Sequence, residues 1–467
     1  MALAEGTEGS AAAPDDAPAA IWDPTRRRLS LGLVLTITLV AFESLAISTV
    51  LPVVSADLGG ISLYGWVFSA FFLGSLLGIV AAGQLADARG TAFPFALGLA
   101  LFSVGLVVGG LAPSMGVLVA GRVAQGIGAG AIPAVAYASV GRAYPPVLRP
   151  RVFAVFSSAW VIPGLVGPAA SSAIAEALDW RAVFLALLPF VLLAAVITLP
   201  ALSRAVPARS ADHAADVAER RGHAVVLVAG VAAVLAAASG APVGLAVVLV
   251  AVGVPLALRA FLRLVPTGTV RLAPGMPAAV LVRGVLTFAF FGTDAYVSLT
   301  FQEVRDQPTW VAGAALTGAT LCWTVAAWVQ ERWIHRVGPR RLVMAGFGFV
   351  AAGTIGMFGA LGPLPVAAAV PLWSLAGFGI GLAYSPLSVT VLGLAAAGRE
   401  GSAASSLQLT DVLGIALGTG LGGVFVALGD SRGWPPRSAL ELAFAATLAV
   451  AVLGVVAARR LPTSLPS

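Results

Sequence analysis

The sequence predicts an all-helical protein that crosses a membrane many times. Of its 467 residues, 59% are hydrophobic and only 10% are charged, whereas soluble proteins average about 25% charged residues. Apolar runs of about 18 residues or more recur along the whole chain, and each is long enough to span a bilayer as a helix. So few charges cannot cover the surface of a globular protein of this length, and a soluble enzyme is therefore excluded.

Fourteen hydrophobic segments follow one another along the chain. Short stretches containing Gly, Pro, Asp or Arg separate them, as expected for loops between helices. An even number of crossings predicts that both termini lie on the same side of the membrane. The segments span residues 29–54, 61–85, 91–111, 114–140, 150–176, 181–203, 222–240, 241–264, 276–302, 308–333, 340–361, 364–395, 403–428 and 438–458.

The arginines predict which side the termini occupy. All 27 basic residues are arginine, a bias typical of GC-rich bacterial genomes. With the N-terminus inside, 21 of them fall in cytoplasmic tails and loops, and four fall in outer loops. By the positive-inside rule, both termini are expected in the cytoplasm and the chain in the cytoplasmic (inner) membrane of a bacterium. The net charge of +6 then reflects membrane topology rather than nucleic-acid binding.

The segments divide the chain into five regions. Residues 1–28 have no apolar core before the arginines and are expected to form a disordered cytoplasmic tail rather than a signal peptide. Two six-helix bundles are expected over residues 29–203 and 276–458. Residues 204–275 would carry cytoplasmic linkers and two inserted helices, the seventh and eighth, and residues 459–467 a second cytoplasmic tail.

Internal similarity supports the division into two bundles. The first segment carries Glu43 and, six residues later, Thr49, while the ninth carries Asp294 and, six residues later, Thr300. The loops after the second and tenth segments are both rich in Gly and charged residues. Two related halves of this kind are typical of transporters built from repeats.

Three motifs lie in the first half. The loop after the second segment reads Gly83-x-x-x-Asp87-x-Arg89-Gly90, followed by Thr-Ala-Phe rather than by a basic pair. The fourth segment contains Arg122-x-x-Gln-Gly-x-Gly-x-Gly. The fifth contains the pair Gly-Pro at 167–168, with two serines at 171–172.

With these motifs on the expected helices, residues 29–458 resemble the major facilitator superfamily, and in particular its fourteen-helix drug/proton antiporter branch. The resemblance implies two pseudo-symmetric six-helix bundles, plus two inserted helices, that rock around a central cavity. It also implies that the loop motif latches the bundles in the outward-facing state and that the Gly-Pro pair marks an exporter. A simple tight turn is the alternative for the loop. The gating residues implied are Gly83, Asp87, Arg89, Gly90, Gly167 and Pro168.

Glu43 is the leading candidate for proton coupling. It follows about 13 residues of its helix, so it lies roughly 20 Å deep. A charged acid there costs about 2.5–3.5 kcal/mol or more, and burial favours the neutral form of a carboxyl. Arg122 in the fourth segment cannot lose its proton and needs an acceptor. We expect it to pair with Glu43, either as a switch that releases the acid during transport or as a fixed structural salt bridge.

Asp294 is the expected counterpart of Glu43 in the second half. Phe290 and Phe291 precede it by four and three residues, so they share its helical face. An acid beside aromatic rings suits a lipophilic cation through charge and cation–π contacts. Asp294 has two alternative roles. It could be a second proton site, which would join Glu43 and Arg122 in proton coupling, or it could be structural.

Further substrate contacts are expected from polar and aromatic side chains. Asp411 and Gln408 lie three residues apart in the thirteenth segment, which is also rich in glycine. Trp160 is one of several aromatic residues able to line a cavity. Asp57, Glu176, Glu303 and Asp306 are expected at the outer rim in solvated structural roles.

Together these observations predict a proton-coupled secondary exporter of lipophilic, often cationic, drugs. No phosphate-binding loop, metal signature or nucleophile triad is present, so we expect no cofactor, no catalysis and the proton gradient as the energy source. The expected partners are small substrates, protons and membrane lipids, with a monomer as the assembly. The alternatives are export of a lipid or amphipathic metabolite, nutrient uptake by proton symport, and a scaffold or sensor that transports nothing.

Overall fold

The computed structural model describes residues 22–143, 152, 155–156, 159–203, 214–238, 241–395 and 400–464. Over these residues the chain is helical and contains no strand. The helices of the first half are α1 (Pro24–Leu58), η1 (Ile61–Leu63), α2 (Tyr64–Arg89), α3 (Ala92–Gly110), α4 (Met115–Ala143), α6 (Val161–Ala177), α7 (Trp180–Leu185) and α8 (Leu188–Ser203).

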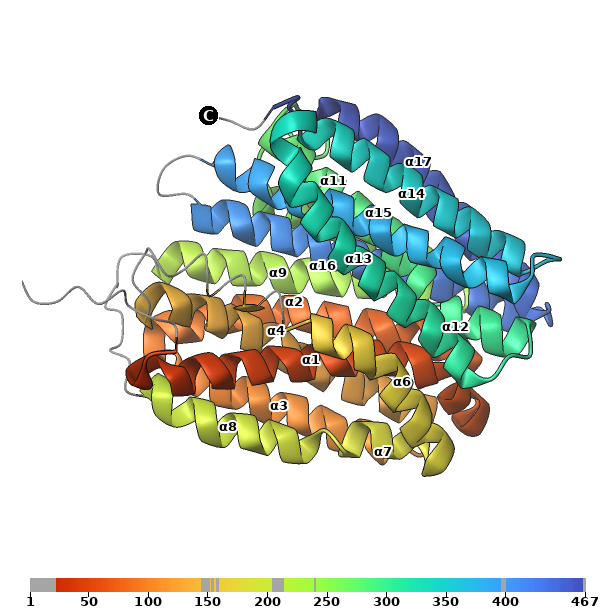
Figure 1. The fold of residues 1–467 in the computed structure, drawn as a ribbon, viewed down its shortest axis with the longest axis horizontal. Coiled ribbons are helices and arrows are strands. Elements are labelled where there is room, and N and C mark those ends of the chain that lie inside the picture. The colour runs from red at the N-terminus through yellow and green to blue at the C-terminus, as the bar shows by residue number, and fades with distance from the viewer. Residues whose placement is uncertain are drawn as a thin grey trace, which may run out of the picture.

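The remaining helices continue from the middle of the chain to its end. They are α9 (Ala214–Ala238), α10 (Val243–Leu264), α11 (Met276–Asp294), α12 (Val297–Leu299), η3 (Thr300–Val304), α13 (Thr309–Val337), α14 (Pro339–Ala360), α15 (Val366–Gly393), α16 (Glu400–Ser431), α17 (Pro436–Ala457) and η4 (Ala458–Arg460). The first described helix begins, and the last ends, at the same end of the bundle (Figure 1).

Twelve apolar helical spans of the described residues are long enough to cross a membrane. The expected fifth and seventh segments contain shorter apolar helices, namely α6 and the part of α9 over Gly222–Ala238. The all-helical, multi-pass prediction is therefore confirmed, whereas the count of fourteen crossings and the side of the termini stay predictions.

The composition of the helices explains why they form inside a bilayer. Apolar side chains surround most of them on all sides, as expected for helices with lipid on one side and protein on the other. On α3, for example, Phe95, Leu99 and Phe102 are buried, while Leu97 and Val104 remain exposed on the surface. Lipid chains would cover the exposed ones.

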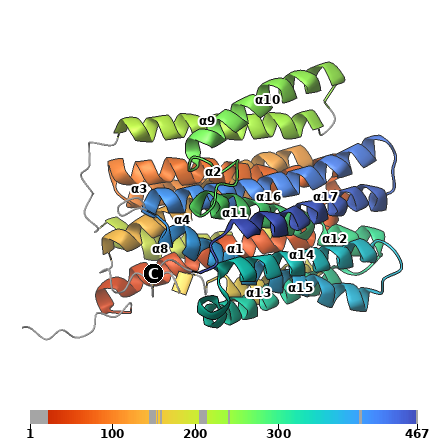
Figure 2. The ribbon, with the colours of Figure 1, turned by 90° about the horizontal axis from the view of Figure 1, so that it is seen from above.

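The helices gather into two groups, with α1–α8 on one side and α11–α17 on the other (Figure 1). In the first group α4 packs along α2 and α3, and in the second α15 packs along α13 and α14. The hairpin of α9 and α10 lies against one flank of the molecule (Figure 2), where α9 contacts both α2 and α16. The limits of the five regions stay predictions.

The two groups meet along α2 and α16 and along α6 and α13. At the predicted outer end the backbones of Gly65 and Gly423 touch, since a methyl group on either glycine would collide with the other. Nearby, Ser69 Oγ donates to the carbonyl of Ala416 over 3.1 Å. Gln302 Nε2 likewise donates to the carbonyl of Thr49 over 3.1 Å. We call these contacts the outer seam.

Two expected segments are not continuous helices. The sixth is divided into α7 and α8, since Pro189 in the first turn of α8 has no N–H for the carbonyl of Leu185. The ninth ends its α-helix at Asp294 and continues through α12 and the π-helix η3. Short π-helical stretches are frequent at functional sites.

Candidate functional site

Glu43 of α1 and Arg122 of α4 form a buried ion pair. Arg122 Nη1 donates to Glu43 Oε1 and also to Gln125 Oε1 over 2.9 Å. Arg122 Nε donates to the carbonyl of Val67 over 3.0 Å, and the guanidinium lies 4.2 Å from the centre of the Phe71 ring. The side chains of Arg122 and Glu43 are only 1% and 3% exposed. The expected contact between these two residues is therefore present.

The glycines of α4 explain how Arg122 reaches this position. A methyl group on Gly126 would collide with the carbonyl of Phe71, and one on Gly130 with that of Ser75, both on α2. On the opposite face Gly128 is equally close to α3 at Gly98. Small residues let helix backbones approach closely. The Arg-x-x-Gln-Gly-x-Gly-x-Gly pattern thus places the guanidinium between α1 and α2.

Asp294 lies at the end of α11, beside an aromatic cluster. Phe290 stacks on Trp373 of α15 with ring centres 5.2 Å apart, and it meets Trp323 of α13 edge-on at 5.8 Å. Phe291 contacts the same Trp323 at 6.2 Å. Asp294 is buried, and among the described residues no ion pair joins it to a cation. We call Phe290, Phe291, Trp323 and Trp373 the aromatic cluster.

Asp411 of α16 pairs with a residue that the sequence interpretation did not select. Arg283 Nε of α11 donates to Asp411 Oδ1 over 2.8 Å, and Tyr384 Oη donates to Asp411 Oδ2 over 2.8 Å. Arg283 Nη1 also donates to the carbonyl of Tyr384 and to Ser388 Oγ. The signal was present in the sequence, since an arginine within an apolar segment needs an acceptor.

Tyr384 connects the two acidic regions of the second half. Its ring contacts Trp323 with centres 5.3 Å apart, and the guanidinium of Arg283 lies over the same ring. Gln408 is half-buried one turn before Asp411 on α16. Trp160 precedes α6 and is 47% exposed, and no ring contact joins it to the aromatic cluster in the described part of the chain. Among the described residues, no ring contact thus links Trp160 to the aromatic cluster.

The loop motif is described in part. Gly83 and Asp87 belong to α2, but their surroundings lie outside the described residues. Arg89 is exposed and lies over the ring of Phe93, 4.9 Å from its centre. Gly90 ends α2 with φ 78° and ψ 173°, a backbone conformation open almost only to glycine. The turn at Gly90 is thus a geometric requirement.

Gly167 and Pro168 lie on α6 between the two groups of helices. A methyl group on Gly167 would make ordinary contacts, at 3.7 Å, with Leu45 and Phe42 of α1. The carbonyl of Pro168 faces Gly313 of α13, where a methyl group would lie 3.4 Å away. Helix α6 therefore contacts α1 and α13 at the same level. Relative movement of the two groups of helices would change these contacts.

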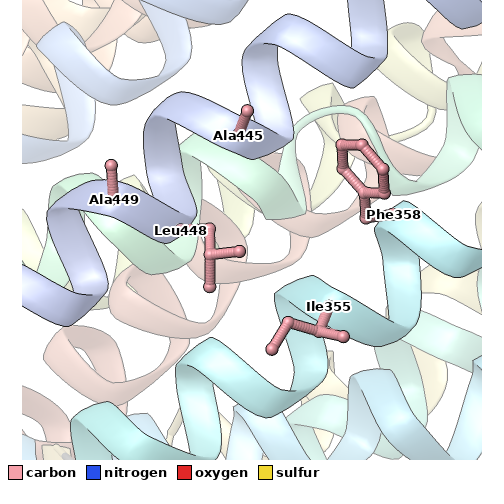
Figure 3. A pocket seen from close by; sticks show the side chains of 5 residues that line it. All are labelled: Ile355, Phe358, Ala445, Leu448 and Ala449. Carbon is pink, nitrogen blue, oxygen red and sulfur yellow. The ribbon is translucent and has the colours of Figure 1, made fainter.

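A shallow groove of about 470 Å³ lies on the surface of the second half. Ile355 and Phe358 of α14 and Ala445, Leu448 and Ala449 of α17 line it (Figure 3). All five side chains are apolar. This groove is separate from the buried acids, and its chemistry suits a hydrocarbon chain. Among the described residues no group of three or more His, Cys, Asp or Glu side chains could hold a metal ion.

Comparison with known sequences identifies relatives of the whole chain. The model of the Major Facilitator Superfamily matches residues 33–419. A probable multidrug-efflux transporter of Mycobacterium tuberculosis is 29% identical over 447 residues, which cover 90% of this chain and 92% of the relative. The multidrug resistance protein Stp of the same organism is 25% identical over 374 residues, covering 78% and 68%.

Solved structures show the same fold. An auto-inhibited peptide transporter of the POT family superposes with a TM-score of 0.65 at 15% identity, covering 94% of this chain and 98% of that one. A bacterial homologue of the human lysosomal transporter Spinster gives a TM-score of 0.64 at 15% identity, with the same coverage. At this identity the likeness concerns the fold alone.

Proposed function

Because the chain belongs to the Major Facilitator Superfamily and has relatives named as multidrug-efflux transporters, we propose that it exports lipophilic, often cationic, compounds in exchange for protons. Transport would proceed by alternating access across the cytoplasmic membrane of a bacterium. The proton gradient would be the only energy source, with no cofactor, and a monomer would be the working unit.

The buried pair of Glu43 and Arg122 carries this proposal. An ionised acid at this depth is stable only with a partner, and Arg122 stays charged under all physiological conditions. Movement of α1 against α4 would separate the two and make Glu43 take up a proton. Since proton inflow is worth about 2.3 kcal/mol per 100 mV of membrane potential, cycles of loading and release can drive export.

The second half supplies the substrate site in this proposal. Asp294 has no cationic partner among the described residues, and the aromatic cluster lies beside it. A lipophilic cation would gain an ion pair with Asp294 and contacts with the ring faces of Phe291 and Trp323. Asp411 is already paired with Arg283 and accepts from Tyr384. In this proposal Asp411, with Tyr384 and Gln408, forms the edge of the substrate site.

The outer seam supports alternating access. Gly65 and Gly423 bring α2 and α16 into backbone contact near one end of the molecule, which is the arrangement expected when the outer end is closed. The residues proposed to gate the change between the outward-open and inward-open states are those of the loop motif and the Gly-Pro pair of α6. Separation of the seam would require α6 to slide on α13 at Pro168.

A second candidate is export of a lipid or amphipathic metabolite, with drug efflux incidental. The apolar groove between α14 and α17 favours it, because an acyl chain fits a surface of this chemistry (Figure 3). This candidate predicts lipid that remains bound after purification and transport that is indifferent to substrate charge.

Proton release in sealed proteoliposomes tests the main proposal. A pH-sensitive dye would report proton movement when lipophilic cations and neutral drugs are added. We expect a signal for the wild type and none for Glu43→Gln. The matched control is Glu441→Gln, because Glu441 lies in an exposed ion pair with Arg437. Full uphill transport by Glu43→Gln would remove Glu43 from the coupling mechanism.

A further inference from the structure

The turn that follows α2 and the turn that follows α13 have the same backbone conformation. Gly90 ends α2 with φ 78° and ψ 173°, and Gly338 ends α13 with φ 83° and ψ 155°. A methyl group on Gly90 would have no described atom within 4 Å, whereas one on Gly338 would collide with the main-chain carbonyl of Thr463. In the second half, the chain beyond α17 therefore covers the turn.

The covering segment consists of η4 and the residues after it, over 458–464, and we call it the strap. The side chains of Ala458 and Leu461 are fully buried, whereas Arg459 and Arg460 are exposed. The amide of Leu461 donates to the carbonyl of Ala458 over 3.1 Å, so a short turn precedes the buried leucine. Burial of apolar surface is favourable, and charges left outside keep their hydration. The strap is thus anchored by packing, with its charges facing away.

Main-chain carbonyls of the strap are bonded to two other helices of the second group. Arg340 Nε, in the first turn of α14, donates to the carbonyl of Leu461 over 2.7 Å. The amide of Gly275, which directly precedes α11, donates to the carbonyl of Arg460 over 3.4 Å. Amides at the start of a helix have no partner within the helix, so an outside carbonyl stabilises them. Because the strap continues α17, it connects the ends of α11, α13, α14 and α17.

These contacts affect how the second group can move. Alternating access requires each group of helices to move as a body, although a single helix could bend alone at its end. Here the four helix ends cannot shift separately without breaking the hydrogen bonds of Arg340 and Gly275 or exposing Leu461. Among the described residues the Gly90 turn has no such cover. The two halves thus share a turn but restrain it differently.

We propose that the strap fastens the predicted cytoplasmic end of the second group into one rigid unit and leaves the turn at Gly90 free to move against it. Leu461 is the anchor, and Thr463 closes the strap over Gly338. The strap would have this role whatever the substrate is, and whether or not Glu43 carries the coupling proton.

Hydrogen exchange of the purified protein, measured by mass spectrometry, tests the strap. Gly338→Ala and Gly90→Ala strain the same backbone conformation, but only Gly338→Ala drives a methyl group into Thr463. We expect Gly338→Ala to speed exchange about tenfold in peptides that contain Gly275, because the amide of Gly275 loses its acceptor. Gly90→Ala should leave these peptides unchanged.

A second variant releases the strap without altering the turn. Leu461→Ser should speed exchange at Gly275 by a similar factor. Adding it to Gly338→Ala should bring little further change, since the strap can be released only once. Leu440→Ser is the control, because Leu440 is equally buried but lies near the opposite end of α17. It should lower the melting temperature without affecting the peptides that contain Gly275.

Spin labels measure whether the strap makes this end of the second group rigid. Arg271 and Arg336 are exposed, shortly before α11 and near the end of α13, and can be labelled once the native Cys322 is replaced. With the strap in place the distribution of distances between the labels should be narrow. It should broaden in Gly338→Ala and in Leu461→Ser, and stay narrow in Gly90→Ala.

Three results would overturn the proposal. If Gly338→Ala and Gly90→Ala change exchange at Gly275 equally, backbone strain rather than the strap is responsible. If Leu461→Ser has no more effect there than Leu440→Ser, the strap does not protect the start of α11. If the distance distribution keeps its width although exchange rises, the strap does not make the helix ends rigid. All three leave the proposed export function untouched, because none of these measurements involves transport.

Discussion

Arg283 Nε donates to Asp411 Oδ1 over 2.8 Å, so Asp411 is the acid of the second half that already has a cationic partner. With Tyr384 Oη bound to the other oxygen, both oxygens of Asp411 are engaged. Asp294, three turns further along α11 than Arg283, has no such partner among the described residues. A cationic substrate would have to displace Arg283 to reach Asp411, whereas at Asp294, which is equally buried, it would displace no cation among the described residues.

Replacing Asp294 by Asn should therefore weaken cation binding selectively. We expect affinity for a lipophilic cation such as tetraphenylphosphonium to fall roughly tenfold, a change of about 1.4 kcal/mol. Affinity for a neutral compound of the same size should stay nearly constant, because the aromatic cluster is unchanged. Equilibrium binding of radiolabelled compounds to protein in detergent measures both. Equal losses for the two compounds would assign Asp294 a structural role.

The Arg283–Asp411 pair should respond to single and double replacement in opposite ways. Arg283→Met leaves a buried, uncompensated carboxylate and should destabilise the protein by about 3–5 kcal/mol, seen as a lower melting temperature in detergent. The double variant Arg283→Met with Asp411→Leu removes both charges and should recover most of that loss. Arg437→Met, at an exposed pair, should cost less than about 1 kcal/mol.

The result to look for is the difference between the single and double variants. If the double variant melts as low as Arg283→Met, the pair is not the source of the loss. The contacts of Arg283 with Ser388 and with the Tyr384 carbonyl would then carry the stability of this region.

The first ion pair can be predicted from the sequence, whereas for the second the sequence shows that Arg283 needs an acceptor but not which acid it meets. Glu43 and Arg122 are ionisable residues deep within apolar segments of the same half, so few other partners exist for either. In the second half Arg283 has two acids to choose from. Asp294 lies eleven residues away on the same helix, about 16 Å, and is out of reach. Asp411 is adjacent only because α16 packs on α11, which periodicity does not reveal.

The fold class follows from composition and segment length, but the interruptions of the helices do not. A hydropathy pattern cannot distinguish one helix from two when both are apolar, as in α7 and α8. The end of α11 at Asp294 is equally hidden, since tertiary contacts such as the hydrogen bond from Tyr296 Oη to the Thr419 carbonyl fix it. Trp160 and Trp373 also look alike in the sequence, although only Trp373 joins the aromatic cluster.

Gly90→Ala should strain the turn that ends α2. At φ 78° and ψ 173° a side chain costs of order 1–3 kcal/mol, although no neighbouring atom would obstruct it. Gly116→Ala is the control, because Gly116 also has open space around it but lies within α4. Thermal unfolding should show a loss for Gly90→Ala and none for Gly116→Ala. Equal melting temperatures would show that the turn relaxes to another conformation.

Gly423→Ala should open the outer seam. Its methyl group would collide with the backbone of Gly65, and since both partners are main chain, neither can rotate away. The conformation in which α2 packs against α16 should lose population, while the packing inside each group of helices stays the same. We therefore expect substrate binding to persist and transport to fall. Gly348→Ala, on α14 with open space around it, should change neither.

Distances between the two groups of helices provide the decisive measurement. Spin labels at Glu176 and Asp430, both exposed near the predicted outer end, report the separation once the native Cys322 is replaced. Gly423→Ala should move the distance distribution to longer values, because the seam must separate to relieve the collision. If the distance distribution is unchanged but transport is lost, the closed state tolerates the added methyl group. The glycine contact would then be needed for a step that follows closure.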